Sequence, residues 1–313
     1  MQGWVMMGNR PALKLIKKRI LSHWQFYAIF FLPLLYIIVF AYIPMPGVLM
    51  GFQRYSVSRG VFGSPWVGLR HFRQFFASPS SFNIILNTLR LGVYSLVAGF
   101  PIPIILALAL NEVGSKFFKK TVQMVTYAPY FISTVVVVGM IMQMSDLRYG
   151  LFNKIGVLFG GSAVNLMASP GFFPHIYVWS GIWQVAGYSA VIYLAALAGV
   201  DRELQEAARV DGVTRIQRIR YVDLPSITPQ IIILLIFGVG SVMGIGFEKA
   251  FLMQNNLNLS RSEIIATFVY KTGLVNSDYS FATAVGLFNS LVSIVLLVST
   301  NTIAKKFTET SLW

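Results

Sequence analysis

Long apolar runs separated by shorter polar stretches form the main pattern along this chain. A helix needs about 20 residues to cross the hydrocarbon core of a bilayer. Six of the runs approach that length and predict membrane-spanning helices over Phe26–Ile43, Thr88–Leu110, Val122–Met144, Ile176–Gly199, Ile227–Phe247 and Ala284–Ile303. The expected fold class is therefore an all-α integral membrane protein.

Prolines and one polar stretch modify this pattern of spans. Pro101 and Pro103 lie in the second expected span and Pro129 lies in the third. Each proline removes a backbone N–H donor, so we expect kinks at these positions. Residues 249–280 are polar, and we expect them to form an outer segment that either stays outside the bundle or re-enters toward its core.

Composition supports a membrane protein and excludes some kinds of site. Only 12% of the 313 residues are charged, whereas soluble domains carry about 25%. The mean hydropathy is +0.66. The chain has no cysteine, which excludes disulfides and thiolate metal sites. His23, His71 and His175 are scattered along the sequence, so we expect no metal site.

The net charge of +14 suggests either a nucleic-acid partner or basic loops on the cytoplasmic side of a membrane. Six spans place both termini on one side, and 15 of the 25 Lys and Arg residues then fall on that side. We therefore expect a membrane protein with both termini cytoplasmic and no nucleic-acid partner. Residues 1–25 are expected to be a retained basic segment, residues 26–303 the spanning domain, and residues 304–313 a cytoplasmic tail.

The segment from residue 201 to residue 225, called the coupling segment below, interrupts the apolar pattern with ten charged residues. Burying them in lipid would cost on the order of 30 kcal/mol, so the segment lies outside the bilayer. Asp201 is placed to cap a helix and Gly212 to end it. Thr214 is placed to cap a second short helix, and Leu224–Pro225 is expected to end the motif and begin the next span.

Small and aliphatic side chains recur along both helices of the coupling segment. Leu204, Ala207 and Ala208 share one face of the first helix, and residues 213, 216, 219 and 222 recur every three positions on the second. A narrow apolar face with a charged rim suits docking against another protein. The alternative is an ordinary solvated cytoplasmic loop.

The stretch EAARVDGVTRIQRIRYVDLP resembles the EAA loop of binding-protein-dependent ABC importer permeases. Valine stands at position 222, where isoleucine is common in that pattern. Other stretches, such as GSPWVGLRHFRQFF, resemble permeases for carbohydrate uptake, and among these the subgroup for fragments of complex polysaccharides. The residues that match the EAA pattern are Glu206, Ala207, Ala208, Asp211, Gly212, Val222, Leu224 and Pro225.

This resemblance implies a type I ABC importer permease fold with about six spans in the bacterial plasma (inner) membrane. It implies that the chain forms half of a path for an oligosaccharide, beside a second permease that is usually a different chain. Two ATPase subunits would dock on the EAA loops, with Glu206 in a polar contact, Gly212 at the bend and Ala207 and Ala208 in close packing. A solute-binding protein outside the cytoplasm would deliver the sugar.

No phosphate-binding G-x-x-x-x-G-K-[ST] motif occurs in the sequence, so we expect no nucleotide cofactor on this chain. ATP and Mg²⁺ are expected on the partner ATPase, and the chain itself is not expected to be an enzyme.

Several residues within or beside the spans are candidates for contact with a sugar, because sugar sites pair aromatic faces with a few polar groups. Packing between helices and an interfacial belt of aromatic residues are the alternatives for all of them. Glu248 and Lys249 follow the fifth span and are candidates for a gate or a sugar contact, or for pairing at the outer interface. The other candidates are Trp183, Gln184, Tyr188, Asn289 and Ser293.

Two other functions fit a polytopic protein less well. An ion-coupled secondary sugar carrier would need either carboxylates inside the spans or broken helices paired between repeats. The spans of this sequence have almost no carboxylates, and the EAA loop would have no purpose in such a carrier. A membrane enzyme would need a catalytic constellation, and the sequence contains neither H-E-x-x-H nor G-x-S-x-G. A dependence of uptake on a separate ATPase would distinguish the importer from both.

Overall fold

The computed structural model describes residues 22–308 and 310–313, and the expected basic run before the first span lies outside them. The described residues form helices, and an isolated antiparallel bridge pairs Gln53 with Trp66. In chain order the elements are α2 (Trp24–Ile37), η1 (Ile38–Tyr42), η2 (Met45–Phe52), α3 (Gly60–Gly63), α4 (Arg70–Ala77), α5 (Pro79–Gly99), α6 (Pro101–Glu112), α7 (Lys116–Tyr127), η3 (Ala128–Phe131), α8 (Thr134–Met144), α9 (Leu151–Leu158), α10 (Phe173–Ala198), α11 (Arg202–Val210), α12 (Arg215–Arg218), η4 (Ile219–Asp223), α13 (Leu224–Gly240), α14 (Phe247–Met253), α15 (Leu259–Ser262), α16 (Ile265–Tyr270), η5 (Lys271–Val275) and α17 (Tyr279–Phe307).

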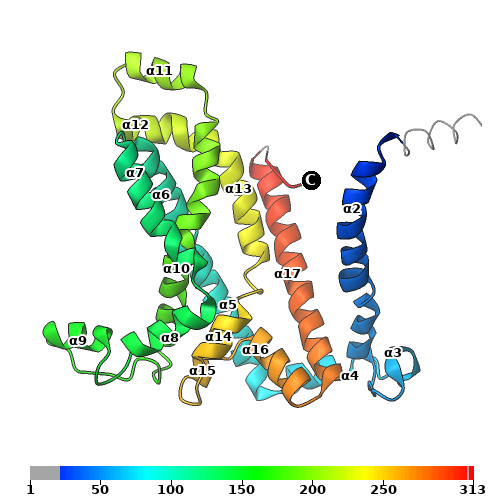
Figure 1. Ribbon diagram of the computed structural model, residues 1–313. Coiled ribbons are helices and arrows are strands. Elements are labelled where there is room, and N and C mark those ends of the chain that lie inside the picture. The colour runs from blue at the N-terminus through cyan, green and yellow to red at the C-terminus, as the bar shows by residue number, and fades with distance from the viewer. Residues whose placement is uncertain (1–21, 309) are drawn as a thin grey trace, which may run out of the picture.

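Within the described part of the chain, five helical stretches are long and apolar enough to cross a membrane, and a sixth span results if one bent pair is counted. This agrees with the all-α membrane fold expected from the apolar runs. The five continuous spans are Trp24–Phe52, Pro79–Glu112, Phe173–Ala198, Arg215–Gly240 and Tyr279–Phe307. Figure 1 shows the longer helices running side by side between an upper and a lower end of the molecule.

The third span is not the straight or gently kinked helix expected over residues 122–144. Its two halves, Lys116–Phe131 and Thr134–Met144, meet at 98°. Pro129 lies in the short 3-10 turn η3, and the chain is extended at Ile132 and at Ser133. Ser133 then caps α8 by accepting a hydrogen bond from the Val136 N–H at 3.4 Å. The expected kink is therefore a full break in the helix.

The fifth span begins and ends earlier than expected. It was expected over residues 227–247, but the continuous helix starts at Arg215 and ends at Gly240. After Gly240 the chain turns, and α14 begins only at Phe247. Glu248 and Lys249 therefore lie on a separate short helix instead of at the end of the span.

The long helix α10 packs against α5, α6, α7 and α13 and contributes to two of the apolar clusters. Toward one end, Tyr177 and Val178 pack with α5, α8 and α14, and Ala250 and Met253 of α14 are fully buried there. Toward the other end, Tyr193 and Leu197 of α10 pack with α6 and α13. Figure 1 shows α10 crossing between these neighbours.

Glycines permit the closest approaches of α10 and α5. A Cβ atom added at Gly187 of α10 would lie 2.0 Å from the carbonyl oxygen of Thr126 in α7. A Cβ atom at Gly92 of α5 would lie 2.1 Å from the carbonyl oxygen of Val242, after α13. No side chain fits at those separations, so glycine sets how tightly these elements pack.

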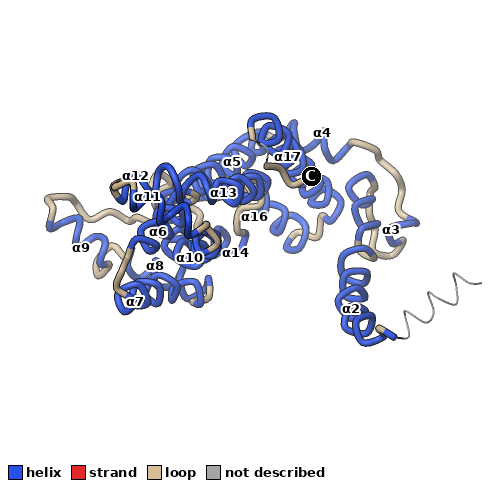
Figure 2. Tube along the Cα trace, turned by 90° about the horizontal axis from the view of Figure 1, so that it is seen from above, coloured by secondary structure: helices blue, strands red, loops and turns tan. Residues whose placement is uncertain are grey.

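The first span stands apart from the other helices. Figures 1 and 2 show α2 separated from α17 and the rest of the bundle in both views. None of its residues is buried. The chain returns to the bundle through η2, where Gly51 allows close approach to the backbone of Ala284 in α17.

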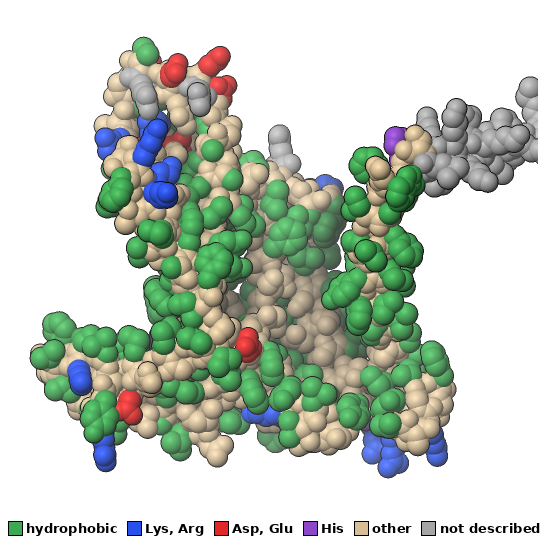
Figure 3. Space-filling model, viewed as in Figure 1, with side chains coloured by type: hydrophobic (Ala, Val, Ile, Leu, Met, Phe, Trp, Pro, Cys, Tyr) green, Lys and Arg blue, Asp and Glu red, His purple; other side chains and the backbone are tan. Residues whose placement is uncertain are grey.

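Charged side chains gather at the two ends of the molecule. Figure 3 shows Lys, Arg, Asp and Glu around α11 and α12 at the upper end and further charged side chains, mostly Lys and Arg, toward the lower edge. Most coloured side chains between them are apolar, apart from one acidic patch partway up the visible face. The start of α2, the C-terminus and α11 all lie at the upper end in Figure 1. An apolar belt between two charged ends is the distribution expected of a protein that crosses a membrane.

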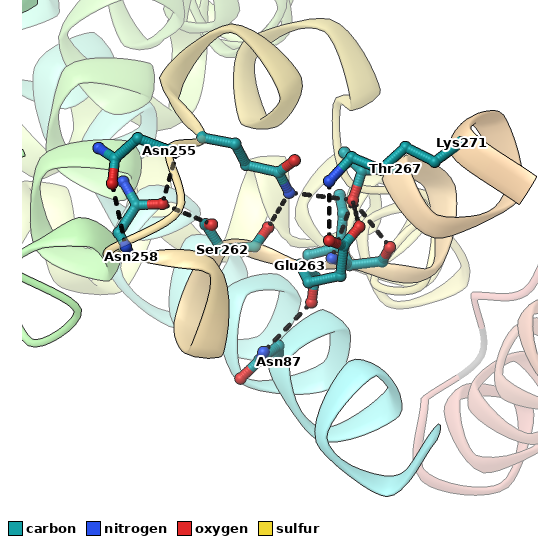
Figure 4. Close-up of polar contacts among 9 residues, drawn as sticks. Asn87, Asn255, Asn258, Ser262, Glu263, Thr267 and Lys271 are labelled. Atoms are coloured by element: carbon teal, nitrogen blue, oxygen red, sulfur yellow. Dashed lines mark hydrogen bonds and ion pairs between the residues drawn. The ribbon is translucent and has the colours of Figure 1, made fainter. Parts of the chain in front are cut away.

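The polar stretch over residues 249–280 folds into the protein through buried hydrogen bonds. Figure 4 shows its central residues converging on α5. Asn87 of α5 donates to the Glu263 carbonyl oxygen at 3.2 Å. The Glu263 carboxylate accepts from Thr267 and from Lys271, each at 2.8 Å, and Gln254 donates to Thr267 at 3.1 Å. These bonds pair most of the buried polar groups of the segment, whereas the side-chain oxygen of Gln254 has no partner among the described residues.

Candidate functional site: the coupling segment and the Lys249 cavity

The first helix of the coupling segment forms as its sequence predicts. The Asp201 carboxylate accepts from the Glu203 N–H at 2.9 Å, which satisfies a free donor at the start of α11. Gly212 has a φ of +70°, a value that residues with a Cβ atom rarely adopt. The Val213 N–H then bonds the Ala208 carbonyl at 3.2 Å and closes the end of the helix.

The second helix starts as predicted but does not end where the sequence suggests. Thr214 and Gln217 form a reciprocal capping box at the start of α12. The chain then continues through the π-helical turn η4 into α13, so Leu224–Pro225 does not separate the motif from the span. The π turn before Pro225 lengthens the local repeat, which accommodates a residue that has no backbone donor.

The residues that match the EAA pattern differ in their exposure to solvent, and they lie either on an outward face or on an inward face of the segment. Glu206 and Ala207 are exposed, whereas Ala208 is only 8% exposed. Val222 and Leu224 are half-buried, and Pro225 is exposed. Figure 1 shows α11 standing clear of the bundle at the upper end. The free face of the coupling segment therefore presents Glu206 beside the small side chain of Ala207.

An ion-paired cluster ties the coupling segment to α6. The Arg218 guanidinium bonds Glu112 at the end of α6, and its Nε lies 3.8 Å from Oδ2 of the fully buried Asp223. Among the described residues, neither carboxylate oxygen of Asp223 has a hydrogen-bond partner. Sequence reasoning missed this cluster, since Glu112 and Arg218 are 106 residues apart and no local pattern links them.

A second candidate site is a cavity of about 380 Å³ between α5, α10 and the connection from α13 to α14. It is called the Lys249 cavity here. Its lining includes small residues from three elements and the aromatic ring of Tyr177. Its volume lies within the range of small-molecule sites, about 300–1,000 Å³. The residues that line it include Gly92, Tyr177, Gly181, Gly238, Ser241 and Lys249.

The aromatic and amide candidates of α10 point away from the Lys249 cavity. Gln184 donates to the Ile132 carbonyl at 2.9 Å, and Tyr188 stacks on Tyr130 with ring centroids 3.9 Å apart. Both side chains therefore pack against the residues at the break in the third span. Trp183 lines a separate apolar cavity of about 610 Å³ together with Phe152. Their expected contact with sugar stays a prediction.

The remaining candidates lie near the chain between α13 and α14. Asn289 of α17 donates to the Met243 carbonyl at 3.2 Å, and Ser293 is half-buried one turn further along. Glu248 is exposed on the first turn of α14. Of the residues that the sequence offered as candidates for a gate or a sugar contact, Lys249 alone lines the Lys249 cavity. Tyr177 and Gly181, its neighbours there, were missed because an aromatic residue and a glycine are ordinary in a span.

Within the described part of the chain, no group of three or more His, Cys, Asp or Glu side chains is placed to hold a metal ion. The two candidate sites are therefore the exposed face of the coupling segment and the Lys249 cavity.

The bundle defines a polytopic membrane protein from which a charged helical segment projects at one end. Residues 99–309, more than half of the chain, match the family described as "Binding-protein-dependent transport system inner membrane component". The chain belongs to this family and is the permease component of a binding-protein-dependent ABC importer. The alternative of an ion-coupled carrier is not favoured.

Two relatives from Bacillus subtilis (strain 168) match along most of their lengths. "Polygalacturonan/rhamnogalacturonan transport system permease protein YteP" is 39% identical over 305 residues, covering 97% of this chain and 94% of that protein. "Protein LplB" is 41% identical over 280 residues, covering 90% of this chain and 88% of that protein.

A solved structure shows the same fold. A permease chain from the structure of a bacterial alginate ABC transporter, in complex with an alginate pentasaccharide-bound periplasmic protein, superposes with a TM-score of 0.86 at 36% identity. The match covers 94% of this chain and 99% of that chain. The expected type I importer permease fold is therefore confirmed.

Proposed function

We propose that this chain forms half of the membrane path of an ATP-driven oligosaccharide importer. A second permease supplies the other half, two ATPase subunits bind ATP and Mg²⁺, and a solute-binding protein delivers the sugar. The observation that carries the proposal is the coupling segment, a helix–glycine turn–helix unit that projects from one end of the bundle. We place that end, with both termini, in the cytoplasm.

The coupling segment suits transmission of force because it is continuous with a span. The helix runs from Arg215 to Gly240, and the Arg218 cluster fastens its start to α6. A movement imposed on α11 and α12 by closure of the ATPase dimer is therefore passed to α13 and α6 together. Packed helices of this kind switch between discrete arrangements, as alternating access requires.

The cargo we propose is a fragment of a polysaccharide, with acidic chains preferred. Relatives named for polygalacturonan and rhamnogalacturonan and for alginate, described as an acidic polysaccharide, support this choice. The Lys249 cavity has the size of a small-molecule site within the bundle.

Copurification of the chain with its candidate ATPase tests the docking surface. We expect the ATPase to elute with the wild-type chain and to be lost from Glu206→Lys, because the variant reverses the charge of the exposed polar contact. Glu203→Lys on the same helix is the matched control and retains the ATPase. Equal binding to the wild type and to Glu206→Lys would contradict the assignment of this surface.

The two alanines provide a second test that depends on the structure. Ala207 is exposed, so Ala207→Arg leaves the chain folded and blocks docking. Ala208 is 8% exposed, so Ala208→Arg destabilises the chain itself. Thermal unfolding in detergent and ATPase copurification separate the two effects. Sugar uptake that continues without any ATPase would contradict the proposal of an ATP-driven importer and would favour the ion-coupled carrier instead.

A further inference from the structure

Lys249 is a buried basic residue that forms no ion pair with the part of the chain that the structure describes. Only 8% of the residue is exposed. Its ammonium donates to the Tyr177 carbonyl at 2.9 Å and lies 5.1 Å from the centre of the Tyr177 ring. The ion pairs among the described residues join Arg218 to Glu112 and Asp223, and Lys271 to Glu263, so Lys249 takes part in none of them.

Burying a lysine in this way is unfavourable in free energy unless the ammonium group binds a ligand. Removing an ammonium group from water carries a penalty that buried lysines normally offset through a carboxylate partner. One carbonyl and one aromatic ring compensate only in part. The ammonium has three N–H donors, and among the described residues one of them has a hydrogen-bond acceptor. The site therefore has unused capacity for an anion.

The space for that anion is beside the ammonium. Lys249 lines the cavity of about 380 Å³ together with Tyr177 and Gly181. A Cβ atom at Gly181 would lie 3.3 Å from the Lys249 Nζ, closer than most such contacts, so glycine keeps the ammonium accessible on that side. The Tyr177 ring adds an aromatic surface of the kind on which sugar rings pack.

We propose that Lys249 binds the carboxylate of an acidic oligosaccharide as the sugar passes through the cavity between α5, α10 and the α13–α14 connection. This inference rests on the proposed function and deepens it by naming the residue that selects for negative charge. Tyr177 is a positioning residue, because its backbone carbonyl holds the ammonium in place.

The test is binding of oligogalacturonate to the purified complex of both permeases and both ATPases, measured by calorimetry without the solute-binding protein. Lys249→Gln keeps a donor for the Tyr177 carbonyl and removes the charge. We expect it to raise the Kd about 10- to 100-fold, the range of one charge-assisted hydrogen bond. Lys249→Arg keeps the charge in a bulkier group, so we expect it to raise the Kd less than Lys249→Gln does.

Two controls separate charge recognition from a structural role. Methyl-esterified oligogalacturonate has the same sugars without the charge, and Lys249→Gln is expected to leave its Kd unchanged. Lys154→Gln, on α9 and exposed, removes a lysine away from the cavity and is expected to change neither Kd. A parallel loss of affinity for both sugars in Lys249→Gln would show a packing role and overturn the inference.

The remaining outcomes distinguish this inference from the proposed function. Equal affinity of the wild type and Lys249→Gln for the acidic sugar, or no affinity in the wild type, overturns the role of Lys249. Uptake into proteoliposomes by the complete transporter is measured in parallel. If the wild type takes up oligosaccharide, the proposed function stands even when the role of Lys249 is overturned. If the wild type takes up no oligosaccharide, both the proposed function and the role of Lys249 are overturned.

Discussion

The Arg218 cluster allows the mechanical link between the coupling segment and the bundle to be tested through stability. Replacing Arg218 with methionine keeps much of the side-chain volume and removes the cation. Glu112 and the fully buried Asp223 would then face each other without a counter-ion. The Arg218 and Glu112 side chains are only 15% and 13% exposed, so water compensates little.

The magnitude follows from the distances and the burial. At 3.8 Å and an effective dielectric constant of about 20, the attraction between Arg218 and Asp223 is about 4 kcal/mol before desolvation. Removing one partner of a buried ion pair costs about 3–5 kcal/mol, because a charge remains without compensation. We therefore expect Arg218→Met to lower the apparent Tm by on the order of 10 °C.

Thermal unfolding of the detergent-purified chain, followed by tryptophan fluorescence, measures the loss. A variant that also carries Glu112→Gln and Asp223→Asn removes the stranded charges and should recover most of the stability. In the assembled transporter, we expect Arg218→Met to lower the amount of sugar moved per ATP hydrolysed. An unchanged Tm in Arg218→Met, or no recovery in the triple variant, would refute the electrostatic account.

Three further substitutions test other parts of the structure. Gly187→Ala should cost about 1–3 kcal/mol, because the added methyl group would lie 2.0 Å from the Thr126 carbonyl oxygen; Gly139→Ala on α8, with open space around it, is the control for the same thermal measurement. Gly212→Ala should cost about 1–2 kcal/mol at a φ of +70° and reduce ATPase copurification, while Gly114→Ala in the α6–α7 connection should leave it unchanged. Glu263→Gln should lower the apparent Tm by removing the counter-ion of Lys271, and adding Lys271→Met should restore part of it; an equal Tm for wild type and Glu263→Gln would show that the pair contributes nothing.

The local structure of the coupling segment was predictable because its signals are local. Asp201 caps the helix that starts next to it, Gly212 supplies a positive φ, and Thr214 pairs with Gln217 three residues away. Each of these interactions joins residues within one helical turn. The second helix of the segment continues through Pro225, and the same local rules did not predict this, since a π turn offsets the effect of the proline.

The sugar-contact candidates show the limit of residue type as a guide. Trp183, Gln184 and Tyr188 have the right chemistry, but successive residues of a helix point about 100° apart. Only the packing of α10 decides which of them meet a cavity and which hold the broken third span. The contacts of Lys249 likewise depend on α10, which lies 72 residues earlier in the chain at Tyr177.

The sequence by itself determined the all-α membrane fold, with most of its spans, and the helix–glycine turn–helix form of the coupling segment. Apolar length and charge act through the solvent and the bilayer, and capping acts between neighbours in the chain, so neither requires knowledge of the fold. The tertiary structure alone decided the 98° break, the Arg218 cluster and the cavity beside Lys249. These features join residues that are distant in sequence, and their energies depend on burial and separation, which exist only once the helices have packed.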